Sequence, residues 1–137
     1  DVTLAGVKAH AHFPPATSDA VIVQRLRAAG AVIIGRTNLS PMAFSPLGVN
    51  RDFGTPGNPA DRTRIPGGSS SGAAVSVTDG MAVAAIGSDT GGSIRMPAAF
   101  CGIAGIKPTQ TRVPLTKTWP LSTTLDSVGP LAPMQFL

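Results

Sequence analysis

The chain has 137 residues, 42% of them hydrophobic, with 16 Gly and 13 Pro, which suits a modest folded domain rich in turns and excludes a disordered chain. The formal net charge of +4 comes from Arg and Lys residues scattered along the sequence, so a nucleic-acid partner, which needs concentrated positive charge, is not expected. No apolar run approaches the ~20 residues of a membrane span, so no membrane partner is expected, and the single Cys101 excludes an internal disulfide and fits a cytoplasmic protein.

The first predicted helix spans residues 18–29, where Ile22 and Leu26 recur at helical spacing and Gly30 suits the position after the last turn. Residues 31–35 follow at once as a continuous apolar run, which is typical of a buried, parallel strand. Residues 36–66 contain repeated prolines and are expected to be irregular. A loop of this length in a compact domain often carries function.

A second helix is predicted over residues 72–79, with serines before it and Gly80 as its stop. Residues 82–87 are predicted as a second buried strand. The alternation of helix and strand indicates an α/β fold, with a mixed, largely parallel sheet flanked by helices. The chain opens on Asp1 rather than Met, and its elements are too few to cover both faces of a sheet. We therefore expect residues 1–137 to be the central part of a single domain, truncated at both ends.

Two clusters of glycine and serine stand out, at residues 66–72 and 87–95. Each adjoins a predicted helix or strand end, where backbone N–H groups lack partners. Glycine has no Cβ to keep a substrate oxygen away, so the run that ends at Ser93 offers a row of N–H donors beside a hydroxyl. An acyl-transfer site needs this combination of nucleophile and oxyanion donors, although ordinary turns remain an alternative at this point.

Several other short patterns offer alternatives. Residues 68–72 match the G-x-S-x-G nucleophile elbow, but no strand precedes them and both histidines lie earlier in the chain. Asp89-Thr90-Gly91 resembles the aspartic-protease triplet, but the apolar residues expected just before it are absent. Neither glycine-rich segment ends in the Gly-Lys-Ser/Thr of a phosphate loop. For His10 and His12 a surface or packing role is favoured over a metal site, so no metal and no cofactor are expected.

The stretch from residue 66 to 109 decides between these alternatives. It reads PGGSSSGAAVSV and then AAIGSDTGGSIRMPAAFCGIAGIKPT, and it resembles the amidase-signature family. Flanking segments, SDAVIVQRLRAAGAVIIGRTNLSPMAFS before it and RVPLTKTWPLSTTLDSVGPLA after it, extend the resemblance over nearly the whole chain. Met96 and residues 111–115 are more similar to the stand-alone bacterial amidases than to other members. The resemblance implies the amidase-signature fold and a Ser-Ser-Lys amide hydrolase.

Residue by residue, the resemblance implies that Ser93 is the nucleophile and Ser69, 24 residues earlier, the serine that relays its proton. It also implies a cis peptide bond between Gly68 and Ser69. The implied oxyanion hole consists of the backbone amides of Thr90, Gly91, Gly92 and Ser93. Supporting roles are implied for Asp89, Arg95, Ser70 and Gly68.

The family lysine that would accept the proton has no match in this sequence. Lys8 is in the wrong context, and Lys107, in the Gly-x-Lys-Pro-Thr stretch, is expected to be structural. We expect the catalytic lysine upstream of Asp1, so that the fragment as given does not turn over. Cys101 is expected to be a buried small apolar residue rather than a nucleophile.

The resemblance therefore implies hydrolysis of a carboxamide C–N bond through a serine acyl-enzyme, with release of ammonia or an amine. The expected partner is a small-molecule amide, and a homo-oligomer of the full-length protein stays open. One alternative is the glutaminase (A) component of a tRNA-dependent amidotransferase. A second alternative is a truncated remnant without catalytic activity.

Overall fold

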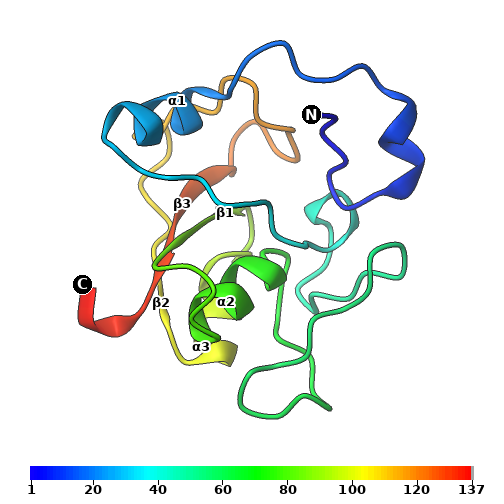
Figure 1. The fold of residues 1–137 in the computed structure, drawn as a ribbon, viewed down its shortest axis with the longest axis vertical. Helices are drawn as coiled ribbons and strands as arrows, with labels where there is room; N and C mark the ends of the chain where they lie inside the picture. Colours follow the sequence, from blue (N-terminus) through cyan, green and yellow to red (C-terminus); the bar gives the residue numbers. More distant parts are fainter. Residues whose placement is uncertain (137) are drawn as a thin grey trace.

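The computed structural model of the protein describes residues 1–136, and its centre is a small sheet of three strands (Figure 1). The strands are β1 (Ala85–Asp89), β2 (Ala104–Gly105) and β3 (Ser127–Ala132), in the spatial order β1-β3-β2. β3 pairs with both neighbours antiparallel, with Ala85 opposite Leu131 and Ala104 opposite Ala132. The mixture of helices and sheet agrees with the expected fold class.

The expected parallel pairing is not found among the strands of residues 1–136, where both strand pairs are antiparallel. The reason lies in β3, which the sequence pattern did not reveal because Gly129 and Pro130 interrupt it. Proline cannot donate to a strand ladder and argues against a strand when only the sequence is read. After β2 the chain makes an irregular excursion and returns as β3 in the opposite direction, between the other two strands.

Three α-helices accompany the sheet: α1 (Val21–Ala28), α2 (Ser71–Thr78) and α3 (Arg95–Cys101). Short 3-10 turns lie at Lys8–His12, Pro41–Ala43 and Met134–Phe136. The predicted helices at 18–29 and 72–79 are confirmed as α1 and α2, and the glycines expected to end them have φ of +88° at Gly30 and +71° at Gly80. α3 was not predicted. Within residues 1–136, no helix has the length and apolar character needed to cross a bilayer.

The strand predicted at residues 31–35 is wrong, because this segment lies in no strand of the described chain. Val32 and Ile34 are 84% and 71% exposed. An apolar run favours a strand, but a strand also needs a neighbour that supplies hydrogen bonds. The predicted strand at 82–87 exists as β1, although it begins only at Ala85. Residues 36–66 are irregular as predicted, apart from the 3-10 turn at Pro41–Ala43.

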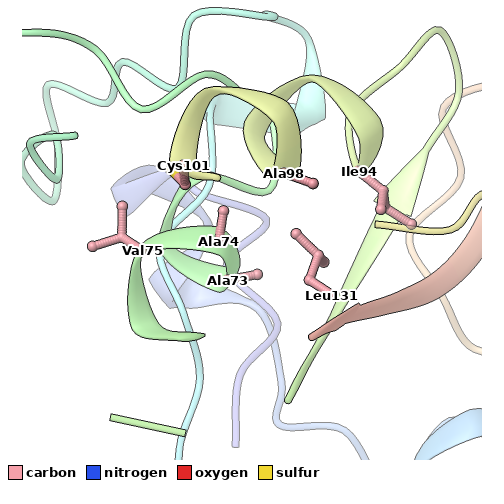
Figure 2. Packing of buried hydrophobic residues seen from close by; sticks show 7 residues of the cluster. All are labelled: Ala73, Ala74, Val75, Ile94, Ala98, Cys101 and Leu131. Carbon is pink, nitrogen blue, oxygen red and sulfur yellow. The ribbon is translucent and has the colours of Figure 1, made fainter. Parts of the chain in front are cut away.

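The buried core joins α2, α3 and β3 (Figure 2). Small side chains on the two helices let them approach each other and the sheet, and larger ones from Ile94 and Leu131 fill the space between them. The cluster consists of Ala73, Ala74, Val75, Ile94, Ala98, Cys101 and Leu131. α2 begins directly after Ser70, and α3 begins directly after Ile94. This packing therefore holds the two serine-containing loops next to each other.

Candidate active site

The loops that carry Ser69 and Ser93 are joined by a backbone hydrogen bond, in which the Ser70 N–H donates to the Ser93 carbonyl oxygen at 3.1 Å. The Ser69 loop is also joined to the long irregular segment before it, because the Ser40 N–H donates to the Ser69 carbonyl oxygen at 3.1 Å. Ser69 is fully buried and Ser93 is 8% exposed. The fold thus brings together the two serines that the sequence singled out.

The peptide bond between Gly68 and Ser69 is cis, as the family resemblance implied. The approach of the chain here is close, because a Cβ added at Gly68 would lie 2.5 Å from the Gly48 nitrogen and 2.7 Å from its Cα. Backbone atoms cannot give way as a flexible side chain can. Glycine is therefore required at position 68 by packing.

The hydroxyl of Ser69 is buried and has no hydrogen-bond partner among the described residues, and the same is true of the neighbouring Ser71 hydroxyl. The expected hydrogen bond between the Ser69 and Ser93 hydroxyls is therefore not formed in this structure. In substrate-free enzymes such bonds are often long or misaligned and shorten when the reacting group is bound. Ser69 keeps its capacity both to accept and to donate a proton.

The loop from Thr90 to Ser93 presents four backbone N–H groups that find no acceptor in residues 1–136. The next two N–H groups, of Ile94 and Arg95, donate to Asp89 Oδ2 at 3.1 and 3.3 Å. The space beside Gly91 is open, since a Cβ built there would meet nothing within 4 Å. Free donors next to open space and a serine hydroxyl are the elements of an oxyanion hole.

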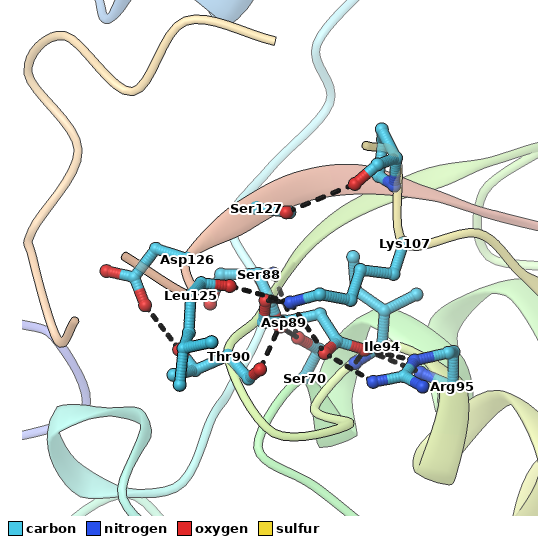
Figure 3. Close-up of polar contacts among 11 residues, drawn as sticks. Ser70, Ser88, Asp89, Thr90, Ile94, Arg95, Lys107, Leu125, Asp126 and Ser127 are labelled. Atoms are coloured by element: carbon cyan, nitrogen blue, oxygen red, sulfur yellow. Dashed lines mark hydrogen bonds and ion pairs between the residues drawn. The ribbon is translucent and has the colours of Figure 1, made fainter. Parts of the chain in front are cut away.

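Asp89 is fully buried beneath this loop and is held by Arg95 (Figure 3). The Arg95 guanidinium donates to both carboxylate oxygens, at 3.0 and 3.1 Å, and the Lys107 Nζ lies 3.3 Å from Oδ1. Burial alone would raise the pKa of Asp89, but the hydrogen bonds from Arg95 and from the backbone N–H groups lower this pKa to about 2. The carboxylate is therefore ionised at neutral pH and fixes the end of the loop.

Ser70, for which the resemblance implied a supporting role, links two elements of the site. Its hydroxyl bridges the backbone of Ser88, accepting from the N–H and donating to the carbonyl oxygen, each at 3.2 Å. This bridge ties the start of α2 to β1. Ser70 is the central serine of the G-x-S-x-G match, and an irregular loop rather than a strand precedes it, so the nucleophile-elbow alternative is not supported.

Two residues that hold the loop were not assigned a site role from the sequence. The Lys107 ammonium donates to the carbonyl oxygens of Asp89, Thr90 and Leu125, which confirms a structural role and places it at the site. Asp126 accepts a hydrogen bond from the Thr90 hydroxyl. A local sequence pattern gives no sign of this contact, because the two residues are 36 positions apart.

The remaining candidates have packing roles. The His10 ring stacks on Trp119 with centroids 5.0 Å apart, and no group of three or more metal-ligating side chains occurs in the described part of the chain. Cys101 is buried as expected. Burial, together with the charge of Asp79, raises the pKa of the Cys101 thiol to about 11, so the thiolate is scarce at neutral pH.

The chain is similar to known proteins in both sequence and fold. The family model described as Amidase matches residues 2–134. The chain is 46% identical over 130 residues to AtzE, which belongs to the 1-carboxybiuret hydrolase of Pseudomonas sp. (strain ADP), a match that covers 95% of the chain and 28% of that protein. It is 48% identical over 130 residues to the A component of the glutamyl-tRNA(Gln) amidotransferase of Koribacter versatilis, covering 95% of the chain and 27% of that protein.

Among solved structures, the peptide amidase of Stenotrophomonas maltophilia superimposes with a TM-score of 0.88 at 43% identity, over 96% of this chain and 28% of that one. The chain thus spans little more than a quarter of the length of the relatives it matches. The family model covers nearly all of the chain, and the neighbouring structures share its fold. The chain belongs to the amidase family.

Proposed function

We propose that the protein hydrolyses the C–N bond of a small carboxamide through an acyl-enzyme on Ser93. The observation that carries the proposal is the row of four N–H groups from Thr90 to Ser93 that have no acceptor among residues 1–136, a row that ends at a serine hydroxyl. Donors fixed before the reaction stabilise the negative oxygen that develops when a serine attacks an amide carbonyl. The buried Ser69 on the adjoining loop supports a proton relay.

In the proposed reaction, the Ser93 hydroxyl oxygen bonds to the carbonyl carbon while its proton passes to Ser69. Ser69 passes its own proton to a neutral lysine amine, which we expect upstream of Asp1. The carbonyl oxygen becomes an oxyanion facing the N–H groups of the loop. The same relay then protonates the leaving nitrogen, the C–N bond breaks, and ammonia or an amine departs. Water hydrolyses the resulting ester by the reverse steps.

A second candidate is the glutaminase role within an amidotransferase, which the 48% identity to the Koribacter versatilis protein favours. A glutaminase of this kind would use the same serine chemistry on glutamine. The two candidates differ in their partners, because a stand-alone amidase acts without other subunits. For either candidate we propose a small-molecule amide as substrate and the cytoplasm as location, and self-association of the full-length protein stays open.

The test is a comparison of Ser93→Ala with Cys101→Ala in the full-length protein. Ammonia release from a panel of small amides, glutamine included, is measured with and without amidotransferase partner subunits and tRNA. Ser93→Ala is expected to abolish release, whereas Cys101→Ala is expected to retain it, because the thiol lies in the core and not at the loop. Full activity of Ser93→Ala would rule out the proposed nucleophile, and an inactive wild type would support the non-catalytic remnant.

Ser69→Ala tests the relay separately. The variant is expected to lose most of its turnover but to keep a slow residual reaction, because the oxyanion donors remain in place. The rate constant of a single turnover, measured with excess enzyme, reports on the chemical step. A wild-type rate constant in Ser69→Ala would show that the proton leaves Ser93 by another route.

A further inference from the structure

Lys107 reaches the loop from Thr90 to Ser93 from the segment that follows β2. Its ammonium donates to the carbonyl oxygens of Asp89 and Thr90, the second at 3.1 Å, and to that of Leu125 at 2.7 Å (Figure 3). An ammonium has three N–H donors, so all of them are used on backbone carbonyls. Lys107 is thus the side chain on which two consecutive carbonyls of the loop converge.

The orientation of these carbonyls fixes the orientation of the donors on the other side of the loop. A peptide unit is planar, and in the trans form its C=O and N–H point in opposite directions. The peptides from Asp89 to Thr90 and from Thr90 to Gly91 are both trans. Because Lys107 holds the C=O groups of Asp89 and Thr90, the N–H groups of Thr90 and Gly91 must point away from it.

The other end of the loop is fixed without Lys107. In the peptide from Ser93 to Ile94, the carbonyl accepts from the Ser70 N–H at 3.1 Å and the N–H donates to Asp89 Oδ2 at 3.1 Å. Asp89 and Arg95 therefore hold the nucleophile end. None of these contacts orients the N–H groups of Thr90 and Gly91. Asp89 is also paired with Ser127 in the ladder of β1 and β3, so the lysine matters most for the peptide from Thr90 to Gly91, which lies beyond β1.

A second contact that fixes Thr90 lies next to the lysine. The Leu125 carbonyl, which accepts from Lys107, adjoins Asp126, whose carboxylate accepts from the Thr90 hydroxyl. The Asp126 carboxylate is itself held by the N–H groups of Leu121 and Ser122, at 2.8 and 2.9 Å. Loss of the ammonium would release two loop carbonyls and loosen the segment that steadies the Thr90 side chain.

We propose that Lys107 is a positioning residue that aims the N–H groups of Thr90 and Gly91 into the oxyanion hole. This inference rests on the proposed function, since it concerns the same loop. The inference goes beyond the proposed function by assigning the orientation of these two donors to a side chain that never touches the substrate. The lysine acts on the reaction by holding the backbone.

The test measures how fast a fluorophosphonate labels Ser93 in the full-length protein, by intact-protein mass spectrometry. Labelling forms the bond from Ser93 Oγ to phosphorus, breaks the P–F bond and releases fluoride, while the serine proton goes to the relay. The phosphoryl oxygen needs the same donors as an oxyanion. Lys107→Ala is expected to lower the second-order rate constant by about 10- to 100-fold, which is the scale of a small misplacement at a reacting centre.

Chemical rescue separates positioning from a merely structural role. The side-chain atoms that Lys107→Ala removes correspond to n-propylammonium, so this cation is expected to restore part of the labelling rate in Lys107→Ala and to leave wild type unchanged. Lys107→Gln, which keeps two N–H donors for the carbonyls, is expected to label faster than Lys107→Ala. The matched control is Lys117→Ala, since Lys117 contacts Ser18 and not this loop, and it is expected to label at the wild-type rate.

The outcomes separate the two proposals. The role of Lys107 would be overturned if the folded fraction of both Lys107 variants were labelled at the wild-type rate. It would also be overturned if n-propylammonium did not reverse the loss of labelling in Lys107→Ala. In both cases Ser93 would remain the nucleophile. If Lys107→Ala does not fold, the rate of Lys107→Gln relative to Lys117→Ala decides the same question. If Ser93 of the wild type is not labelled, the proposed function itself fails.

Discussion

Asp89 shows how a single buried charge organises the site. Its carboxylate is fully buried, but it accepts from Arg95 and from the N–H groups of Ile94 and Arg95, and Lys107 lies within 3.3 Å. A buried ion is costly unless it is paired and hydrogen-bonded. Here every partner belongs to the loop or to the segment that supports it, so the charge and the loop geometry depend on each other.

Asp89→Asn is predicted to lower the free energy of unfolding by about 2–3 kcal/mol at neutral pH, below the usual cost of breaking a buried pair because Arg95 is half exposed. The pKa of Asp89 is lowered to about 2 in the folded protein. Its contribution is therefore present above about pH 4 and lost as the pH falls to about 2. The difference between wild type and variant, measured by urea unfolding, should shrink over that interval.

The control for this charge is Asp61→Asn, because the Asp61 side chain is 42% exposed and its partners, Thr63 and Arg64, are its close neighbours in the chain. Little change in the unfolding free energy is expected. If the loss of unfolding free energy in Asp89→Asn did not vary between about pH 4 and pH 2, the ionised carboxylate would not be the source of the lost stability.

At the scale of single residues, the sequence predicted which residues make up the site better than it predicted the contacts between them. The serine pair and the glycine-rich loop could be found because they are contiguous motifs, and the implied cis bond at Ser69 is present. The roles proposed for Ser69 and Ser93 remain predictions. Asp126 could not be found, because its contact with Thr90 exists only after the chain has folded back over 36 residues.

At the scale of elements, the contact between β1 and α2 fixes the positions of the loops that carry Ser69 and Ser93 relative to each other. Gly87 on β1 faces Ser70 at the start of α2, and a Cβ added at Gly87 would lie 2.6 Å from Ser70 Oγ and 3.0 Å from Leu131 Cδ1. The Ser70 hydroxyl uses this space to bridge the Ser88 backbone. The strand and the helix can approach this closely only because position 87 has no side chain.

Gly87→Ala is predicted to destabilise the protein by about 1–3 kcal/mol, the usual cost of overpacking. It should also lower activity, because the displaced Ser70 would lose its bonds to Ser88. The matched control is Gly35→Ala, where a Cβ would meet nothing within 4 Å. Thermal unfolding and amide hydrolysis of both variants check the prediction. Equal unfolding temperatures for the two variants would show that β1 and α2 can separate without cost.

The elements show why some of the fold could be predicted and some could not. α1 and α2 carry their own stop signals, with Gly30 and Gly80 in the left-handed region. α3 is only seven residues long and has Pro97 in its first turn, where a helix tolerates proline, so no longer helical pattern reveals it. β3 contains Pro130, which only its surroundings make acceptable. The apolar segment at 31–35 has the composition of a strand but no strand partner within residues 1–136. Pairing is a property of two segments, and a local pattern describes only one.

On the scale of the whole molecule, Asn50 connects parts of the chain that share no helix or strand. It is 2% exposed, and its Nδ2 donates to the carbonyl oxygens of Gly6 at 2.9 Å and Leu39 at 2.8 Å. Its Oδ1 accepts from the N–H groups of Asp52 and Phe53, at 2.8 and 3.0 Å. One side chain thus joins the N-terminal segment to the long loop that leads to Ser69.

Asn50→Asp is predicted to cost about 3 kcal/mol of unfolding free energy at neutral pH, because a carboxylate cannot donate to the two carbonyls and instead faces them with a negative charge. These carbonyls raise the pKa of the introduced carboxyl above its value in the unfolded chain. The loss of unfolding free energy should therefore be smallest in acid, where a proton restores one donor, and should grow as the pH rises.

The control is Gln24→Glu, which makes the same chemical change at an exposed side chain that donates to the Asp19 carbonyl at 2.8 Å. Its unfolding free energy should show little of this pH dependence. Urea unfolding of both variants across acidic pH checks the prediction, and equal pH profiles would mean that the Asn50 amide does not hold these segments together.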